Sequence, residues 1–97
     1  MATPYIMPDQ VTSPKRYWVL VKVLLDTGEG GYSIALGRWE NDPALGIRWN
    51  GTKDNPIGNP QSRGLPTWFI VPADLQDAIL EKVQKKDMVQ FALKFLE

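Results

Sequence analysis

The turn sequence DTGEGG, residues 26–31, constrains the fold of this chain more than any other segment. Its three glycines can adopt the positive φ angles of tight turns without steric cost. The run before it, RYWVLVKVLL, is rich in valine and aromatic residues. The run after it, YSIALGRWE, alternates apolar residues with small or polar ones. Two such runs joined by a glycine turn predict an antiparallel β-hairpin.

A third strand is expected to follow the hairpin directly. Residues 42–45, DPAL, fit a type I turn with Asp at the first position and Pro at the second. The next run, LGIRWNG, places Ile47 and Trp49 on one face. We therefore predict a three-stranded meander whose second turn is centred on residues 43–44.

The rest of the chain predicts a loop, a strand, a helix and a final strand. Residues 51–66 hold three glycines and three prolines without periodicity, which is typical of a long loop. The run TWFIV at 67–71 predicts a buried strand, the apolar spacing over 74–85 one amphipathic helix, and the alternation over 88–96 a fifth strand. The predicted fold class is α+β, a five-stranded antiparallel bent sheet or partly open barrel in the order β-β-β-loop-β-α-β.

The length of 97 residues leaves room for one domain with one modest core. Residues 1–15 contain three prolines, which disfavour a helix or a central strand. We therefore expect residues 1–15 to form a loosely ordered N-terminal arm and residues 16–97 a single globular domain.

Composition excludes several functional classes. The chain has no cysteine and no histidine, so it lacks thiolate metal ligands and the commonest general base. We therefore expect a non-enzymatic protein, with no catalytic residues, no metal and no cofactor. The N-terminus lacks the apolar core of a signal peptide, and no run approaches the ~20 apolar residues of a membrane span. These features predict a cytoplasmic protein of bacterial or phage type without a membrane partner.

Two Arg-Trp pairs in the segment GRWENDPALGIRWNG carry the functional hypothesis. With the second turn centred on residues 43–44, Trp39 lies opposite Arg48. Matching the apolar faces of the first hairpin places Trp18 opposite Trp39. These three side chains, which we call the Trp-Arg row, would then cross three neighbouring strands on the face opposite Ile34.

The Trp-Arg row has two interpretations. The helix or the long loop covers it, with Arg48 stacked on an indole ring, or it is an exposed binding platform. Tryptophan and arginine dominate protein-binding hot spots, and they also stack on single-stranded nucleic acid. The platform predicts a small binding or regulatory module that engages a protein partner or a second copy of itself. Single-stranded nucleic acid is the alternative partner, although eleven basic residues balanced by eleven acidic ones favour protein.

The long loop supplies three further candidate binding residues, Lys53, Asn59 and Arg63. Backbone amides near glycines, together with the two cations, can hold a phosphate or carboxylate group. The other interpretation of this loop is a solvated connector.

The segment LLDTG, residues 24–28, resembles the active-site motif of retroviral-type aspartic proteases, whose subunits are about as long as this chain. The resemblance implies that Asp26 pairs with its twin across a homodimer and that the two carboxyls share one proton. Thr27 and Gly28 match the rest of the motif. The resemblance covers five residues, and the family's later apolar strand with its glycine turn before a helix is missing. The same residues are also typical of a turn, so a protease dimer is the second alternative.

Overall fold

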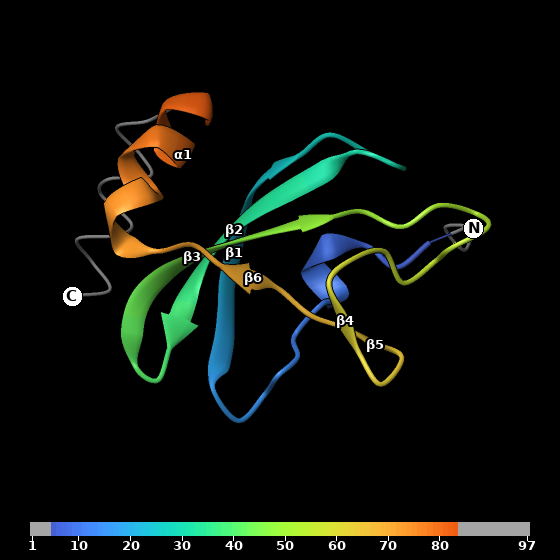
Figure 1. The fold of residues 1–97 in the computed structure, drawn as a ribbon, viewed down its shortest axis with the longest axis horizontal. Coiled ribbons are helices and arrows are strands. Elements are labelled where there is room, and N and C mark those ends of the chain that lie inside the picture. Colours follow the sequence, from blue (N-terminus) through green and yellow to red (C-terminus); the bar gives the residue numbers. More distant parts are fainter. Residues whose placement is uncertain (1–4, 84–97) are drawn as a thin grey trace.

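The computed structural model describes residues 5–83 and has an α+β fold (Figure 1). Its elements are η1 (Pro8–Gln10), β1 (Trp18–Asp26), β2 (Tyr32–Trp39), β3 (Asp42–Trp49), β4 (Gln61–Ser62), β5 (Leu65–Pro66), β6 (Phe69–Ile70), η2 (Ala73–Leu75) and α1 (Gln76–Lys82). The strands form a four-stranded sheet in the order β1-β2-β3-β6 and a separate two-stranded sheet of β4 and β5. The α+β class and the antiparallel pairing are confirmed. The main sheet has four described strands, and the fifth strand expected at 88–96 lies outside the described residues.

In the first hairpin, β1 pairs with β2 in the predicted register only at the end away from the turn. Trp18 lies opposite Trp39 as expected, but β1 carries two irregularities, one between Leu20 and Lys22 and one between Val23 and Leu25. Each bulge adds a residue to one strand without a partner on the other and bends the strand. Beyond the bulges the partners differ from those predicted, because side-chain alternation alone does not reveal where an extra residue is inserted.

The second hairpin turns three residues earlier than predicted, at Glu40 and Asn41. These two residues have positive φ angles of 50° and 74°, as in a two-residue type I′ turn. A type I′ turn has the twist of the flanking strands, whereas the type I turn expected at 43–44 would splay them. Pro43 therefore lies within β3, opposite Arg38.

The change of turn moves Arg48 along the sheet but does not change its face. Trp39 lies opposite Asp42, and Arg48 lies opposite Ser33, near the other end of the hairpin. The predicted pairing of Trp39 with Arg48 is therefore wrong. The strands slide by an even number of residues relative to the prediction, so Trp18, Trp39 and Arg48 still share one face.

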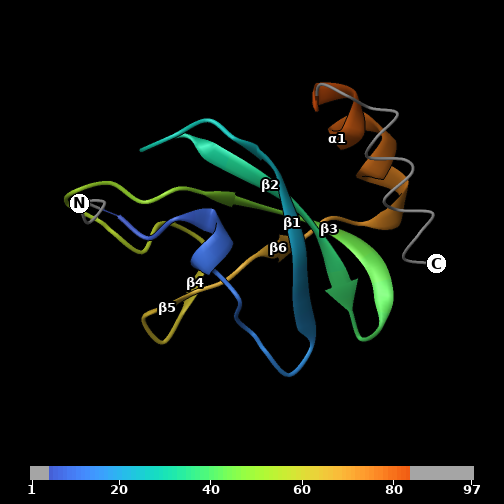
Figure 2. The same cartoon turned by 180° about the vertical axis from the view of Figure 1, so that it is seen from behind.

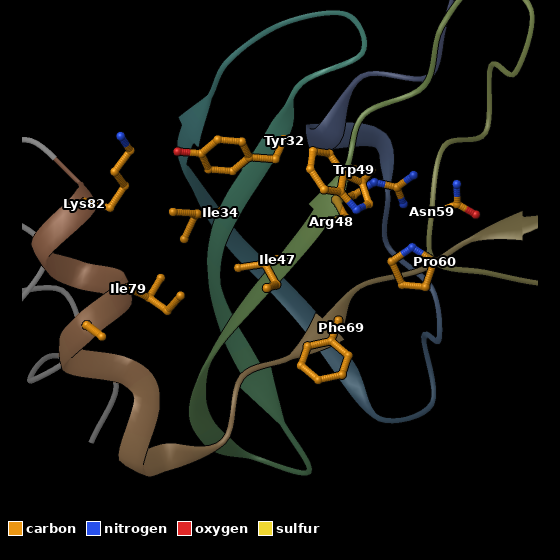
Figure 3. A pocket seen from close by; sticks show the side chains of 11 residues that line it. Tyr32, Ile34, Ile47, Arg48, Trp49, Asn59, Pro60, Phe69, Ile79 and Lys82 are labelled. Carbon is orange, nitrogen blue, oxygen red and sulfur yellow. The ribbon is translucent and has the colours of Figure 1, made fainter.

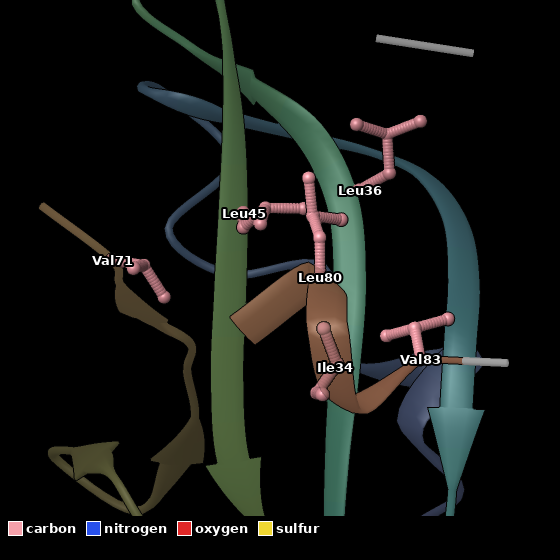
Figure 4. Packing of buried hydrophobic residues seen from close by; sticks show 6 residues of the cluster. All are labelled: Ile34, Leu36, Leu45, Val71, Leu80 and Val83. Carbon is pink, nitrogen blue, oxygen red and sulfur yellow. The ribbon is translucent and has the colours of Figure 1, made fainter. Parts of the chain in front are cut away.

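Buried side chains cover both faces of the sheet. The cluster under α1, which we call the helix-side core, is shown in Figure 4 and consists of Ile34, Leu36, Leu45, Val71, Leu80 and Val83. The opposite cluster, which we call the N-terminal core, consists of Val11, Trp18, Ala35, Ala44 and Trp68. Figure 2 shows the N-terminal segment with η1 well apart from α1. The small residues that β2 and β3 present to the N-terminal core leave room for two indole rings.

Close packing in the N-terminal core explains Gly37 and the position of residues 5–15. A Cβ atom on Gly37 would lie 2.4 Å from Cη2 of Trp18, so only glycine fits beneath this ring. The Trp18 and Trp68 rings lie 6.3 Å apart, and Nε1 of Trp68 donates a 2.6 Å hydrogen bond to the carbonyl of Val11. Val11, from the segment expected to be an arm, is fully buried.

The fourth strand and the helix are shorter than predicted. β6 has two residues and pairs antiparallel with β3 through Gly46 and Ile47. α1 ends at Lys82 because Val83 adopts an extended conformation. Within residues 5–83, no helix has the length and apolar character needed to cross a membrane.

Candidate functional site

The Trp-Arg row does not form an exposed platform. Trp18 is 2% exposed and Arg48 is 4% exposed, so both belong to the interior. Trp39 is half-buried, and its ring lies 5.5 Å from the ring of Tyr17. Trp18 and Arg48 are therefore covered by the protein itself and are not part of an exposed binding platform.

Arg48 connects β3 to the long loop. Its Nη1 donates a 2.7 Å hydrogen bond to the carbonyl of Thr67, and its Nη2 donates to the carbonyl of Ile57. The guanidinium carbon lies 6.0 Å from the ring centroid of Trp68, so the cation–π partner is Trp68 rather than Trp39. Burial lowers the pKa of the Arg48 guanidinium, because desolvation disfavours its charged form. An arginine nevertheless stays protonated in a protein, so the buried Arg48 side chain keeps its positive charge.

The loop backbone approaches this guanidinium closely at Gly58. A Cβ atom there would lie 2.4 Å from the carbonyl oxygen of Trp49 and 2.7 Å from Nη2 of Arg48. Gly58 also has a positive φ of 71°. Glycine at this position therefore lets the loop reach the end of β3.

The three candidate residues of the long loop lie against different elements. Lys53 is exposed, and its backbone N–H donates a 3.0 Å hydrogen bond to Oε2 of Glu29 in the first turn. Arg63 is exposed in the turn between β4 and β5. Asn59 forms an isolated antiparallel bridge with Trp49. The structure therefore brings Asn59 alone close to Arg48.

Asp26 takes part in the hydrogen bonds of the first turn. Its Oδ1 accepts 2.9 Å hydrogen bonds from the backbone N–H of Gly28 and from Nδ2 of Asn50. Asn50 is buried and also accepts a 2.6 Å hydrogen bond from Oγ of Ser33. These contacts account for Asp26 as a turn residue, and they lend no support to the protease alternative.

A groove with a cavity volume of about 610 Å³ opens between α1 and the adjacent face of the sheet (Figure 3). This volume lies within the roughly 300–1,000 Å³ typical of ligand sites. We call this site the groove, and its lining residues are Tyr32, Ile34, Ile47, Arg48, Trp49, Asn59, Pro60, Phe69, Ala78, Ile79 and Lys82. Of the six binding residues proposed from the sequence, Arg48 and Asn59 line it.

Exposed aromatic rings mark the open side of the groove. The ring of Trp49 is 61% exposed and packs edge-on against Tyr32, with 6.5 Å between ring centroids. Phe69 in β6 is 55% exposed and lies opposite Ile47 of β3. Leu45, on the same face as Trp49, is fully buried. The helix-side face of β3 is therefore covered at one end and open at the other.

The groove carries positive charge but no carboxylate. Its two charged lining residues are Arg48 and Lys82, and none of the other described residues that line it is acidic. Figure 3 shows Lys82 on α1 at one end and Arg48 beside Trp49 at the other, with apolar side chains between them. The Arg48 side chain is buried on the opposite face of the sheet, so the site combines an apolar floor with one exposed cation, Lys82.

Sequence reasoning missed the groove because it depends on how far α1 reaches across the sheet. The alternation of β3 already placed Ile47 and Trp49 on one face. Nothing in that pattern shows that the helix covers Leu45 and leaves Trp49 open.

Comparison with protein-family models, curated proteins and solved structures gives no match for this chain. In residues 5–83, no group of three or more acidic, cysteine or histidine side chains is arranged to hold a metal ion. The chemistry of the site therefore has to be argued from the groove itself.

Proposed function

We propose that this chain is a small non-enzymatic binding module that takes an apolar side chain of a protein partner into the groove. The observation that carries this proposal is the exposure of Trp49 and Phe69 beside a cavity of about 610 Å³. Large apolar rings left open around a concavity are typical of interaction sites, because burying them against a partner is favourable. Aromatic anchors in a pocket are also the usual centres of binding hot spots.

The charge distribution favours a protein over a nucleic acid. The chain has no net charge, and the segment that covers the groove carries Asp74 and Asp77. A protein that binds a phosphate backbone usually has a clear excess of basic residues, and this chain has none. Single-stranded nucleic acid stays a second candidate because Trp49 and Phe69 offer exposed rings for base stacking.

The proposal can be tested with peptides selected against the full chain from a random peptide library. Binding of a selected, fluorescently tagged peptide is then measured by anisotropy for the wild type, for Phe69→Ala and for Leu65→Ala. Leu65 is the matched control, because it is 58% exposed but does not line the groove. We expect Phe69→Ala to weaken binding at least tenfold and Leu65→Ala to change it less than about twofold.

Three outcomes would contradict the proposal. One is that the library yields no binder, and another is that both variants weaken binding equally. The third is that a single-stranded oligonucleotide binds in the groove while peptides do not, with an affinity that falls steeply as salt is added. A complex of two copies, detected by sedimentation and abolished by Phe69→Ala, would identify the chain itself as the partner.

A further inference from the structure

The side chain of Asn50 joins the end of β3 to the first turn. Asn50 is 5% exposed, and its Nδ2 donates hydrogen bonds of 2.9 Å to Oδ1 of Asp26 and 2.7 Å to the carbonyl of Gly28. Its Oδ1 accepts a 2.6 Å hydrogen bond from Oγ of Ser33. The amide thus acts as donor and acceptor at once, and an ionised carboxyl group, which only accepts, could not replace it.

The residue that follows Asn50 must be glycine. A Cβ atom on Gly51 would overlap the backbone carbonyl of Pro56 in the long loop. The carbonyl of Gly51 also accepts a 3.0 Å hydrogen bond from the backbone N–H of Gly30. We call the contact of Asn50 and Gly51 with residues 26–31 the turn junction, and its packing requires asparagine followed by glycine.

The same dipeptide is chemically labile. Asparagine is one of the thermolabile residues of proteins. A following glycine has no Cβ and restricts the backbone least, so its nitrogen can approach the asparagine side chain with little steric hindrance. Asn50 is the only asparagine in the chain that precedes a glycine.

We infer that Asn50 is a site of spontaneous deamidation, protected while its side chain is bound to the first turn and reactive once the turn junction opens. The backbone nitrogen of Gly51 attacks Cγ of Asn50, so that a new N–Cγ bond replaces the Cγ–Nδ2 bond. The side-chain nitrogen leaves as ammonia and takes the proton of the Gly51 N–H. Water then adds to one of the two carbonyl carbons of the resulting succinimide and opens the ring to aspartate or isoaspartate.

The product does not fit the turn junction. A carboxylate at position 50 would place an oxygen where Nδ2 now lies, 2.9 Å from Oδ1 of Asp26. Like charges repel strongly in so buried a site, and the carbonyl of Gly28 would lose its donor. The isoaspartate form also lengthens the backbone before Gly51. A deamidated chain therefore cannot restore the junction, and the lifetime of the native fold is limited by how often the junction opens.

Peptide mapping by mass spectrometry tests the inference on the full-length protein, incubated in mildly alkaline buffer with and without denaturing urea. We expect Asn50 to convert at least tenfold faster in urea, because reaction in buffer requires an opening of the junction. Asn55 and Asn59 are internal controls, since each precedes a proline, which has no N–H to supply the proton. Neither should convert in either condition.

Two serine variants test whether the hydrogen bonds of the amide provide the protection. Ser33→Ala removes the donor to Oδ1 of Asn50 and leaves the Asn-Gly dipeptide unchanged. It should speed conversion in buffer about fivefold, as expected for the loss of one hydrogen bond, without changing the rate in urea. Ser62→Ala is the matched control at an exposed serine in β4 and should change neither rate.

Four results would overturn the inference. The first is equal conversion of Asn50 in buffer and in urea, and the second is no conversion in urea. The third is that Ser33→Ala accelerates conversion no more than Ser62→Ala does. The fourth concerns the product, which Asn50→Asp reproduces in its aspartate form: an unchanged melting temperature of this variant would show that the turn junction tolerates the carboxylate.

Discussion

At the scale of single residues, Arg48 and Trp49 each lie in surroundings that their side-chain chemistry alone does not suggest. Arg48 is a charged residue in the interior, and Trp49, its neighbour in sequence, is a large apolar residue on the surface. Both result from their positions at the end of β3, where the loop covers one face and α1 does not reach the other. In this Arg-Trp pair, Arg48 is therefore a buried structural residue and Trp49 is an exposed one.

Arg48→Met should destabilise the protein by about 2–4 kcal/mol. The substitution removes the donors of the Thr67 and Ile57 carbonyls and releases the loop from β3. Urea unfolding followed by circular dichroism measures the change, with Arg63→Met as the control at an exposed arginine. The control should stay within about 0.5 kcal/mol of the wild type. A similar small effect of Arg48→Met would show that the guanidinium does not anchor the loop.

Gly37→Ala should destabilise the protein by about 2 kcal/mol or more, because the new methyl group overlaps the ring of Trp18 and the carbonyl of Val19. Thermal unfolding measures the loss, and near-ultraviolet circular dichroism reports the displacement of the indole. An unchanged melting temperature would mean that Trp18 does not pack on Gly37.

At the scale of elements, the second hairpin shows how turn geometry decides between two plausible loops. Residues 42–45 have a good type I sequence, yet the chain turns at Glu40 and Asn41. The two-residue turn extends β3 to Asp42 and lets eight residues of β2 pair with eight of β3. This turn places two non-glycine residues at positive φ, which is sterically unfavourable.

Glycine substitutions distinguish the two turns. Asn41→Gly should stabilise the protein by about 0.5 kcal/mol, since glycine is favoured at the second position of a type I′ turn. Ala44→Gly should destabilise it by about 1 kcal/mol, because Ala44 is a buried residue within β3. The denaturation midpoints of both variants provide the test. The opposite order of stabilities would place the turn at 43–44.

At the scale of the whole molecule, two small cores lie on either side of one sheet, and the groove opens where the helix-side core ends. This arrangement gives the four tryptophans different exposures, and Trp39 is half-buried. Trp18 and Trp68 are 2% and 4% exposed, whereas Trp49 is 61% exposed. Trp49 is therefore the tryptophan whose ring stays accessible beside the groove.

Acrylamide quenching should detect this difference. Trp49→Phe should remove most of the readily quenched tryptophan fluorescence, and Trp18→Phe should leave that component nearly unchanged. The measurement is made at several protein concentrations, because self-association through the groove would shield Trp49 as concentration rises. Equal loss in both variants would contradict the separation of the indoles.

The sequence by itself determined the faces of β2 and β3 and of the first residues of β1, whereas the bulges change the faces of later β1 residues. Strand periodicity is two residues, so the separation of Ile34 and Leu36 from Trp18 and Arg48 follows from alternation and survives the change of turn. The first hairpin also follows from its glycines. Local chemistry is sufficient for these features because neighbours in sequence decide them.

Only the tertiary structure decided which side chains are buried and where the site lies. Burial of Trp18 depends on its packing with Val11 and Trp68. Exposure of Trp49 depends on how far α1 extends over β3. These contacts join segments far apart in the chain, and their energies come from packing and desolvation rather than from local preference. The alternation of β3 therefore predicts the face of Trp49, and the docking of α1 determines that this face is open.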